Sequence, residues 1–190
     1  MTSRISRLAV AFLATAGATL GVTIANPAPA SAAATICYNT SQAPSYASIA
    51  NQAASIWNNA TSNLTLTANC GTNLRIYQIT GGGSYAVRTS LGNGRVYIDT
   101  QQAAQYSPLR IMTHEIGHIL GLPDNYNGNC ALLMSGGSAG TGCTNPYPSS
   151  AEANRVSSLF AGSRVSAEKD AAGSEVFRDS WPAPALAPIG

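Results

Sequence analysis

The two histidines of the chain lie four residues apart, in the segment His114-Glu115-Ile116-Gly117-His118. On a helix, residues i and i+4 face the same way one turn apart, so both imidazoles can reach one Zn²⁺ at about 2.1 Å each. Glu115 is offset around the helix and can approach a water at the ion without being a ligand. The spacing therefore predicts a zinc site with Glu115 as a general base.

A catalytic zinc ion needs three protein ligands and one open position. The chain has no third histidine, so a carboxylate has to serve. Asp124 follows His118 by six residues, after Gly121, which can end the helix and reverse the chain. We expect Asp124 to be the third ligand, with Glu152, on a later helix, as the alternative. A helix whose histidines bind no metal is the remaining interpretation.

The histidines are predicted to lie on a helix that spans about residues 108–120. Ser107 stands at the N-cap, Pro108 at the first helical position and Gly121 just past the end. The apolar residues of this segment form a core-facing stripe, roughly opposite the histidines, that consists of Leu109, Met112, Ile116, Ile119 and Leu120.

Other periodic segments predict the elements that must hold this helix. Alternating apolar and polar residues indicate short strands, and apolar residues at spacings of three and four indicate helices. Strands are predicted within residues 35–40, 64–70, 73–80, 84–90 and 95–100, and further helices within 45–63 and 150–160.

The ends of the chain differ from its middle. Residues 1–32 begin with two arginines, continue as an uncharged apolar run and end in small residues, which is the layout of a cleaved signal peptide; a membrane anchor is the alternative. Residues 33–162 are predicted to be one compact domain. Residues 163–190 lack periodicity, and we expect a disordered or processed C-terminal tail. A docking segment, or one that restrains activity, is the alternative.

Charge and cysteine content limit the classes of function. The predicted domain is almost neutral and has no basic cluster, so neither nucleic acid nor a membrane surface is an expected partner. Four cysteines in an exported chain predict two disulfides, with three possible connectivities. Spacing favours Cys37 with Cys70 and Cys130 with Cys143. A zinc site made of cysteines is disfavoured because no C-x-x-C pair occurs.

The run THEIGHILGLPDNYNGNCALLMSGG (113–137), followed by CTNPYP (143–148), closely resembles the snapalysin family. These are small secreted bacterial neutral zinc metalloproteases whose fold belongs with the metzincins. The resemblance implies an α+β domain in which a twisted, mostly parallel sheet of four to five strands packs on a backing helix and an active-site helix, followed by a C-terminal helix. It also implies aspartate as third ligand, Met134 as an apolar floor below the zinc and a disulfide between Cys130 and Cys143.

One departure from the family concerns calcium. The family is expected to bind calcium through an aspartate shortly before the zinc helix, where this chain has Ser107. A hard cation requires anionic oxygen ligands, so calcium is doubtful here.

Together these features predict a secreted, monomeric zinc endopeptidase that acts on proteins or peptides. Tyr126, two residues after Asp124, is the candidate donor to the developing oxyanion. The resemblance implies a preference for an aromatic residue beside the cleaved bond. A secreted zinc hydrolase of a non-protein amide and a zinc-containing binding module without turnover are the alternatives.

Overall fold

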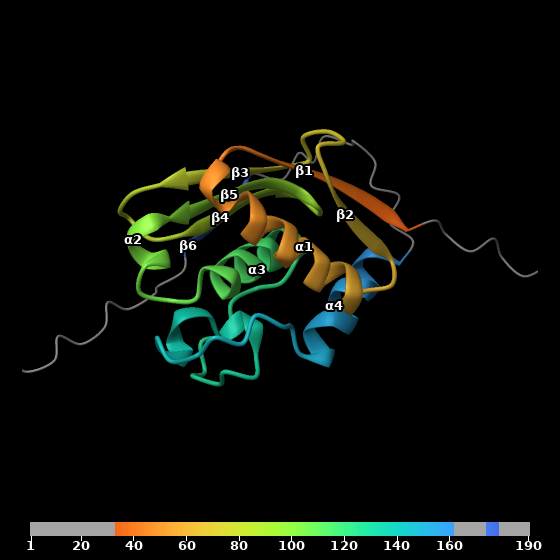
Figure 1. Ribbon diagram of the computed structural model, residues 1–190. Helices are drawn as coiled ribbons and strands as arrows, with labels where there is room; N and C mark the ends of the chain where they lie inside the picture. The colour runs from red at the N-terminus through yellow and green to blue at the C-terminus, as the bar shows by residue number, and fades with distance from the viewer. Residues whose placement is uncertain (1–32, 162–173, 179–190) are drawn as a thin grey trace, which may run out of the picture. The chain divides into compact units, whose positions relative to one another are not determined.

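The computed structural model describes residues 33–161 and 174–178 (Figure 1). The predicted signal peptide and most of the predicted tail lie outside these residues. The strands are β1 (Ala34–Gln42), β2 (Leu64–Ala68), β3 (Leu74–Ile79), β4 (Tyr85–Ser90), β5 (Asn93–Asp99) and β6 (Glu175–Arg178). The helices are α1 (Ala47–Ala60), α2 (Thr100–Ala103), α3 (Pro108–Ile119) and α4 (Ser150–Phe160), with 3-10 segments η1 (Pro44–Tyr46) and η2 (Leu133–Ala139).

The described strands form one mixed sheet in the order β2-β1-β3-β5-β4-β6. Strands β2, β1, β3 and β5 run parallel, whereas β4 is antiparallel to β5 and β6 is antiparallel to β4. The predicted α+β class with a mostly parallel sheet is therefore confirmed. The sheet has six strands among the described residues instead of four to five, because the tail contributes β6.

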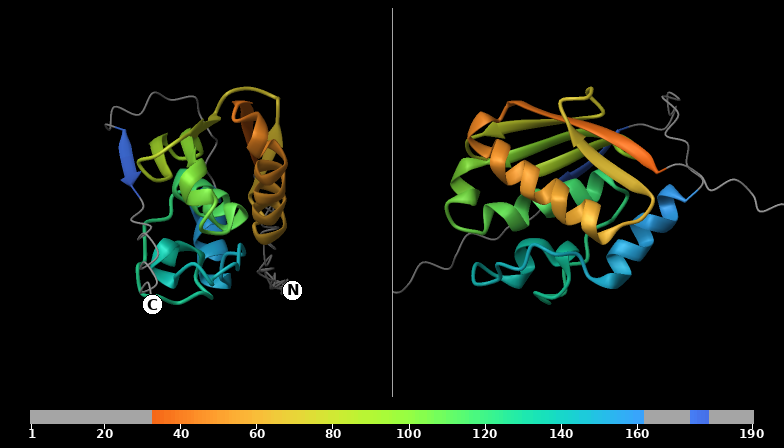
Figure 2. Two further views of the ribbon diagram at one scale, coloured as in Figure 1. Left: turned by 60° about the vertical axis from the view of Figure 1, so that its left-hand side comes forward. Right: turned by 45° about the vertical axis from the view of Figure 1, so that its right-hand side comes forward.

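Helices α1 and α3 cover one face of the sheet (Figures 1 and 2). The two helices are joined through Trp57 of α1, which is fully buried and whose Nε1 donates to the carbonyl oxygen of Thr113 at 3.0 Å. This buried indole fills the space between α1 and α3 and satisfies its own N–H. Trp57 thus fixes the position of α3 relative to α1.

Both predicted disulfides are present, Cys37–Cys70 and Cys130–Cys143. The first joins β1 to the turn that precedes β3. The second closes the segment that runs from the end of α3 towards α4, where η2 is the only regular element that the structure describes. Each bridge contributes roughly 3 kcal/mol on the chain-entropy model.

Strand β6 lies inside the tail for which the sequence predicted no regular structure. Four residues are too few to give a periodic signal, and their strand forms only because β4 offers an edge to pair with. Within the described ranges, no helix has the length and apolarity that a membrane span would need.

Candidate metal centre

Helix α3 begins and ends at the predicted residues. The Ser107 hydroxyl accepts a hydrogen bond from the Arg110 N–H, so the position that the resemblance associates with calcium is a helix cap here. At the other end, the N–H groups of Gly121 and Leu122 donate to the carbonyls of His118 and Gly117, both at 3.0 Å. Gly121 has φ +99°, a left-handed conformation that favours glycine. This motif turns the chain back across the last turn of the helix.

Three side-chain atoms converge where the chain turns back. The Nε2 atoms of His114 and His118 are 3.1 Å apart, and they lie 3.4 and 3.3 Å from Asp124 Oδ1. When ligands lie about 2.0–2.1 Å from a tetrahedral zinc ion, neighbouring ligand atoms are separated by about 3.3–3.4 Å. The spacing of the three atoms therefore matches three corners of such a site, and both imidazoles are fully buried.

The outer nitrogens of both imidazoles define their tautomers. His114 Nδ1 lies 3.1 Å from the Leu133 carbonyl oxygen, and His118 Nδ1 lies 2.9 Å from the Leu122 carbonyl oxygen. A carbonyl only accepts, so each Nδ1 carries the proton and each neutral ring presents a lone pair at Nε2. Two lone pairs and a carboxylate oxygen that face one another are mutually repulsive, and a cation among them removes the repulsion. The residues therefore fit a metal ion.

The pKa shifts at the cluster give the charges of His118 and Asp124. Burial lowers the pKa of His118 below its ordinary value, although Asp124 partly opposes that shift. For Asp124, burial alone would raise the pKa of the carboxyl. Hydrogen bonds and charge attraction from His114 and His118, which act when an imidazole carries a proton at Nε2, outweigh burial and lower this pKa well below its ordinary range. At neutral pH, His118 is therefore uncharged and Asp124 is ionised, which are the states that metal binding requires.

Glu152, the alternative third ligand, is not brought to this cluster. Its carboxylate accepts the backbone N–H groups of Leu133 at 3.1 Å, Met134 at 2.8 Å and Ser149 at 2.6 Å. Both carboxylate oxygens of Glu152 therefore accept backbone N–H groups, and the structure does not bring them to the two imidazoles. Glu152 instead holds η2 in place, and the carbonyl of Leu133 in that segment accepts from His114.

Arg110 holds the same segment from the side of α3. Its guanidinium is buried and donates to the Leu132 carbonyl at 2.9 Å, the Ser135 hydroxyl at 2.9 Å and the Asn145 carbonyl at 2.6 Å. No role for Arg110 was predicted from the sequence. An arginine one turn before His114, with apolar residues on both sides, is the signal that could have identified it.

Met134 packs against α3 at Gly117, the glycine between the two histidines. It is 2% exposed, and a Cβ atom added to Gly117 would lie only 2.9 Å from its sulfur. The glycine between the two histidines is therefore required for the close approach of Met134 to the helix. The carbonyl of Met134 accepts a hydrogen bond from the Asn125 N–H at 2.8 Å. This bond links the residue after Asp124 to Met134.

The two predicted catalytic side chains differ in their surroundings. Glu115 is fully buried on α3, next to His114 in the sequence, whereas Tyr126 is 44% exposed in the loop after Asp124.

Phe177, which was not predicted from the sequence, also lies at the site. Its ring, on β6, stacks on the His118 ring, with centroids 4.4 Å apart.

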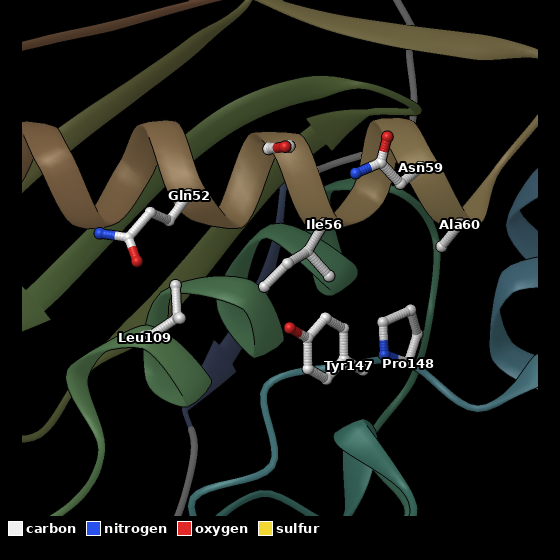
Figure 3. A pocket seen from close by; sticks show the side chains of 8 residues that line it. Gln52, Ile56, Asn59, Ala60, Leu109, Tyr147 and Pro148 are labelled. Atoms are coloured by element: carbon white, nitrogen blue, oxygen red, sulfur yellow. The ribbon is translucent and has the colours of Figure 1, made fainter.

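A separate groove of about 400 Å³ lies between α1, the first turn of α3 and the segment before α4 (Figure 3). Ile56, Leu109 and Tyr147 give it apolar walls. None of the residues that line it is a candidate metal ligand or Glu115. The groove is therefore distinct from the candidate metal centre.

The known proteins that this chain resembles are all extracellular neutral proteases of Streptomyces. The sequence profile of the Streptomyces extracellular neutral proteinase (M7) family matches residues 33–163. An extracellular small neutral protease of Streptomyces lividans is 45% identical over 139 residues, which are 72% of this chain and 61% of the relative. Its counterpart in Streptomyces caespitosus is 44% identical over 128 residues, 67% of this chain and 97% of the relative.

The protein of Streptomyces coelicolor with the same name is 44% identical over 136 residues, 70% of this chain and 62% of the relative. The chain thus spans about three fifths of the length of two of these relatives and nearly all of the third. Its predicted domain coincides with the profile match, and on these grounds the chain belongs to the Streptomyces extracellular neutral proteinase (M7) family, the snapalysin family.

Proposed function

We propose that this chain is a secreted zinc-dependent endopeptidase that hydrolyses peptide bonds in proteins. His114, His118 and Asp124 would hold one zinc ion, and Glu115 would be the general base. The observation that carries the proposal is the convergence of two imidazole lone pairs and a carboxylate oxygen, 3.1 to 3.4 Å apart. The family and the names of the relatives, extracellular neutral proteases, support the substrate class and the extracellular location.

When bound, zinc would lower the pKa of a coordinated water towards about 7 and polarise the scissile carbonyl. Two protein features prepare the site for the ion. The Leu133 and Leu122 carbonyls hold the imidazoles in the tautomer that leaves Nε2 free of a proton. Met134, which is buried against Gly117, would form an apolar floor below the ion.

Glu115 would accept a proton from the attacking water at one carboxylate oxygen and donate it to the leaving amine. Glu115 follows His114 directly in α3, and the helix fixes the angle between consecutive side chains. The direction of the Glu115 side chain relative to that of His114 is therefore set. Tyr126 would donate from its hydroxyl to the developing oxyanion. Its position in the loop that Asn125 anchors to Met134 supports this role, because that loop also carries Asp124.

The test compares wild type with Glu115→Gln. Each protein is assayed on casein with and without phenanthroline, and its zinc content is measured after dialysis. We expect wild-type proteolysis to be abolished by the chelator and restored by zinc. Glu115→Gln should retain one zinc per chain and lose activity by a factor on the order of 100 to 10,000, since the amide cannot accept a proton.

Proteolysis near the wild-type level in Glu115→Gln would remove the proposed base. A chain that retains zinc but cleaves neither casein nor a panel of peptides would favour a non-protein amide substrate or a binding module. These outcomes separate the proposed function from both alternatives.

A further inference from the structure

Strand β4 is the outer strand of the sheet core, and β6 covers its free edge (Figures 1 and 2). The register pairs Tyr85 with Arg178, Ala86 with Phe177, Val87 with Val176 and Arg88 with Glu175. Without β6, β4 would present unpaired N–H and C=O groups along this edge. Such an edge accepts an extended peptide as an additional strand.

The pairing brings one side chain of β6 onto a candidate metal ligand. The Phe177 ring stacks on the His118 ring, with centroids 4.4 Å apart and planes 12° from parallel. The neighbouring side chains point elsewhere, as expected for alternation along a strand. Val176 is 53% exposed, and the Arg178 guanidinium lies 4.7 Å from the Tyr85 ring. Phe177 therefore occupies space that a peptide paired with β4 would need next to the metal centre.

Arg88 links the strand to the active-site helix. Its Nη1 donates to the His118 carbonyl at 2.9 Å, its Nη2 pairs with the Glu175 carboxylate, and its guanidinium lies 5.0 Å from the Phe177 ring. One side chain of β4 thus contacts the two β6 residues on either side of Val176. These contacts fix the register that puts Phe177 on His118.

Strand β6 also lies outside the part of the chain that defines the family. The profile match ends at residue 163, and the relative from Streptomyces caespitosus is covered over 97% of its length by 128 residues. The core fold of the family is therefore specified without β6. This distinguishes β6 from β1 to β5, which all lie within the match.

We propose that residues Glu175–Arg178 occupy the free edge of β4 as an intramolecular competitor of peptide substrates. The segment lies antiparallel to β4 and fills the position beside His118 with an aromatic ring. Substrate has to displace β6 before it can pair with β4. The link to proteolysis rests on the proposed function, whereas occupancy of the edge does not.

The experiment uses the full chain with Phe177→Ala and, as a matched control on the same strand, Val176→Ala. Hydrogen exchange of the amides of Tyr85–Arg88 reports whether β6 is in place, and hydrolysis of a fluorogenic peptide reports access to the site. Loss of the ring contact should speed exchange and raise kcat/KM by about tenfold. Val176→Ala should match wild type in both measurements. Glu175→Arg, a change at an exposed side chain, should act in the same direction as Phe177→Ala without affecting folding.

A labelled peptide with the sequence of residues 173–180 provides a second measurement that requires no turnover. It should bind Phe177→Ala and compete poorly with the tethered segment in wild type, where concentrations on the order of 1 mM would be needed. Faster exchange and peptide binding without any proteolysis would support β6 as the occupant while refuting the proposed function. Unchanged exchange in both Phe177→Ala and Glu175→Arg, or faster exchange with unchanged or lower kcat/KM in an active enzyme, would overturn the proposal.

Discussion

Replacement of Glu152 by glutamine tests whether this carboxylate, which accepts backbone N–H groups of η2, positions the candidate metal centre without touching it. Glutamine has nearly the same shape. Its oxygen can still accept from Leu133 and Ser149, as Oε2 does at 3.1 and 2.6 Å. Its amide nitrogen would face the Met134 N–H, which now donates to Oε1 at 2.8 Å, so that donor loses its acceptor.

The expected loss of stability has two sources. An N–H left without an acceptor in a buried turn costs about 1 to 3 kcal/mol, and the two remaining hydrogen bonds are no longer made to a charged acceptor. We therefore expect the free energy of unfolding to fall by about 3 kcal/mol, which corresponds to a fall in Tm of about 10 °C. Because the Leu133 carbonyl holds His114, zinc affinity should also fall by about 10 to 100-fold.

Two control variants separate this effect from its alternatives. Ser149→Ala removes the hydroxyl that caps α4 and accepts the Glu152 N–H but leaves the carboxylate in place, so it should cost about 1 kcal/mol without weakening zinc binding. Arg155→Gln changes one charge at an exposed position of α4 and should alter stability by less than about 0.5 kcal/mol. Thermal unfolding gives the stabilities, and competition with a chromogenic chelator gives the zinc affinities. If Glu152→Gln equals Arg155→Gln in both measurements, the anchoring role is refuted.

Three further outcomes are expected. Tyr126→Phe should lower kcat by about 100-fold and leave zinc content unchanged, because only a donor to the oxyanion is lost; an unchanged kcat on a peptide substrate would exclude that role. The metal-free protein should lose stability as pH falls below about 6.5, because unfolded His118 takes up a proton there while the buried side chain, with its lowered pKa, does not. Asp124, whose pKa is also lowered, should add a further loss of stability as pH falls below about 4. A Tm, measured in chelator, that does not fall between pH 8 and pH 5 would contradict a lowered pKa of His118 in the folded protein. Serine at both Cys130 and Cys143 should lower stability by about 3 kcal/mol and zinc affinity with it, whereas the same change at Cys37 and Cys70 should lower stability alone. Unfolding and zinc titrations of the two double variants, run in parallel, check this contrast.

Much of the fold could be predicted from local patterns. The N-cap Ser107, Pro108 and Gly121 bound α3 closely, because capping depends on residues within one turn of the helix end. The strands up to Asp99 and α4 were also predicted, since their alternation or helical spacing extends over five residues or more. Strand β6 was not predicted, because four residues of a tail carry too little pattern and its pairing partner lies 87 positions earlier at the Arg88–Glu175 pair.

In the candidate site, too, some residues could be predicted from local spacing and others only from the tertiary structure. By itself the sequence determined the histidine pair and Glu115, since the helical repeat alone places residues i and i+4 on one side. The preference for Asp124 over Glu152 depends on where two loops lie in space, which only tertiary structure shows. The chain reversal at Gly121 brings Asp124 to the imidazoles, whereas the Glu152 carboxylate accepts backbone N–H groups of η2. The support from Arg110 and Met134, and the stacking of Phe177 on His118, likewise arise between segments distant in the sequence. Such contacts are selected by packing and by the burial of polar groups, which no local spacing encodes.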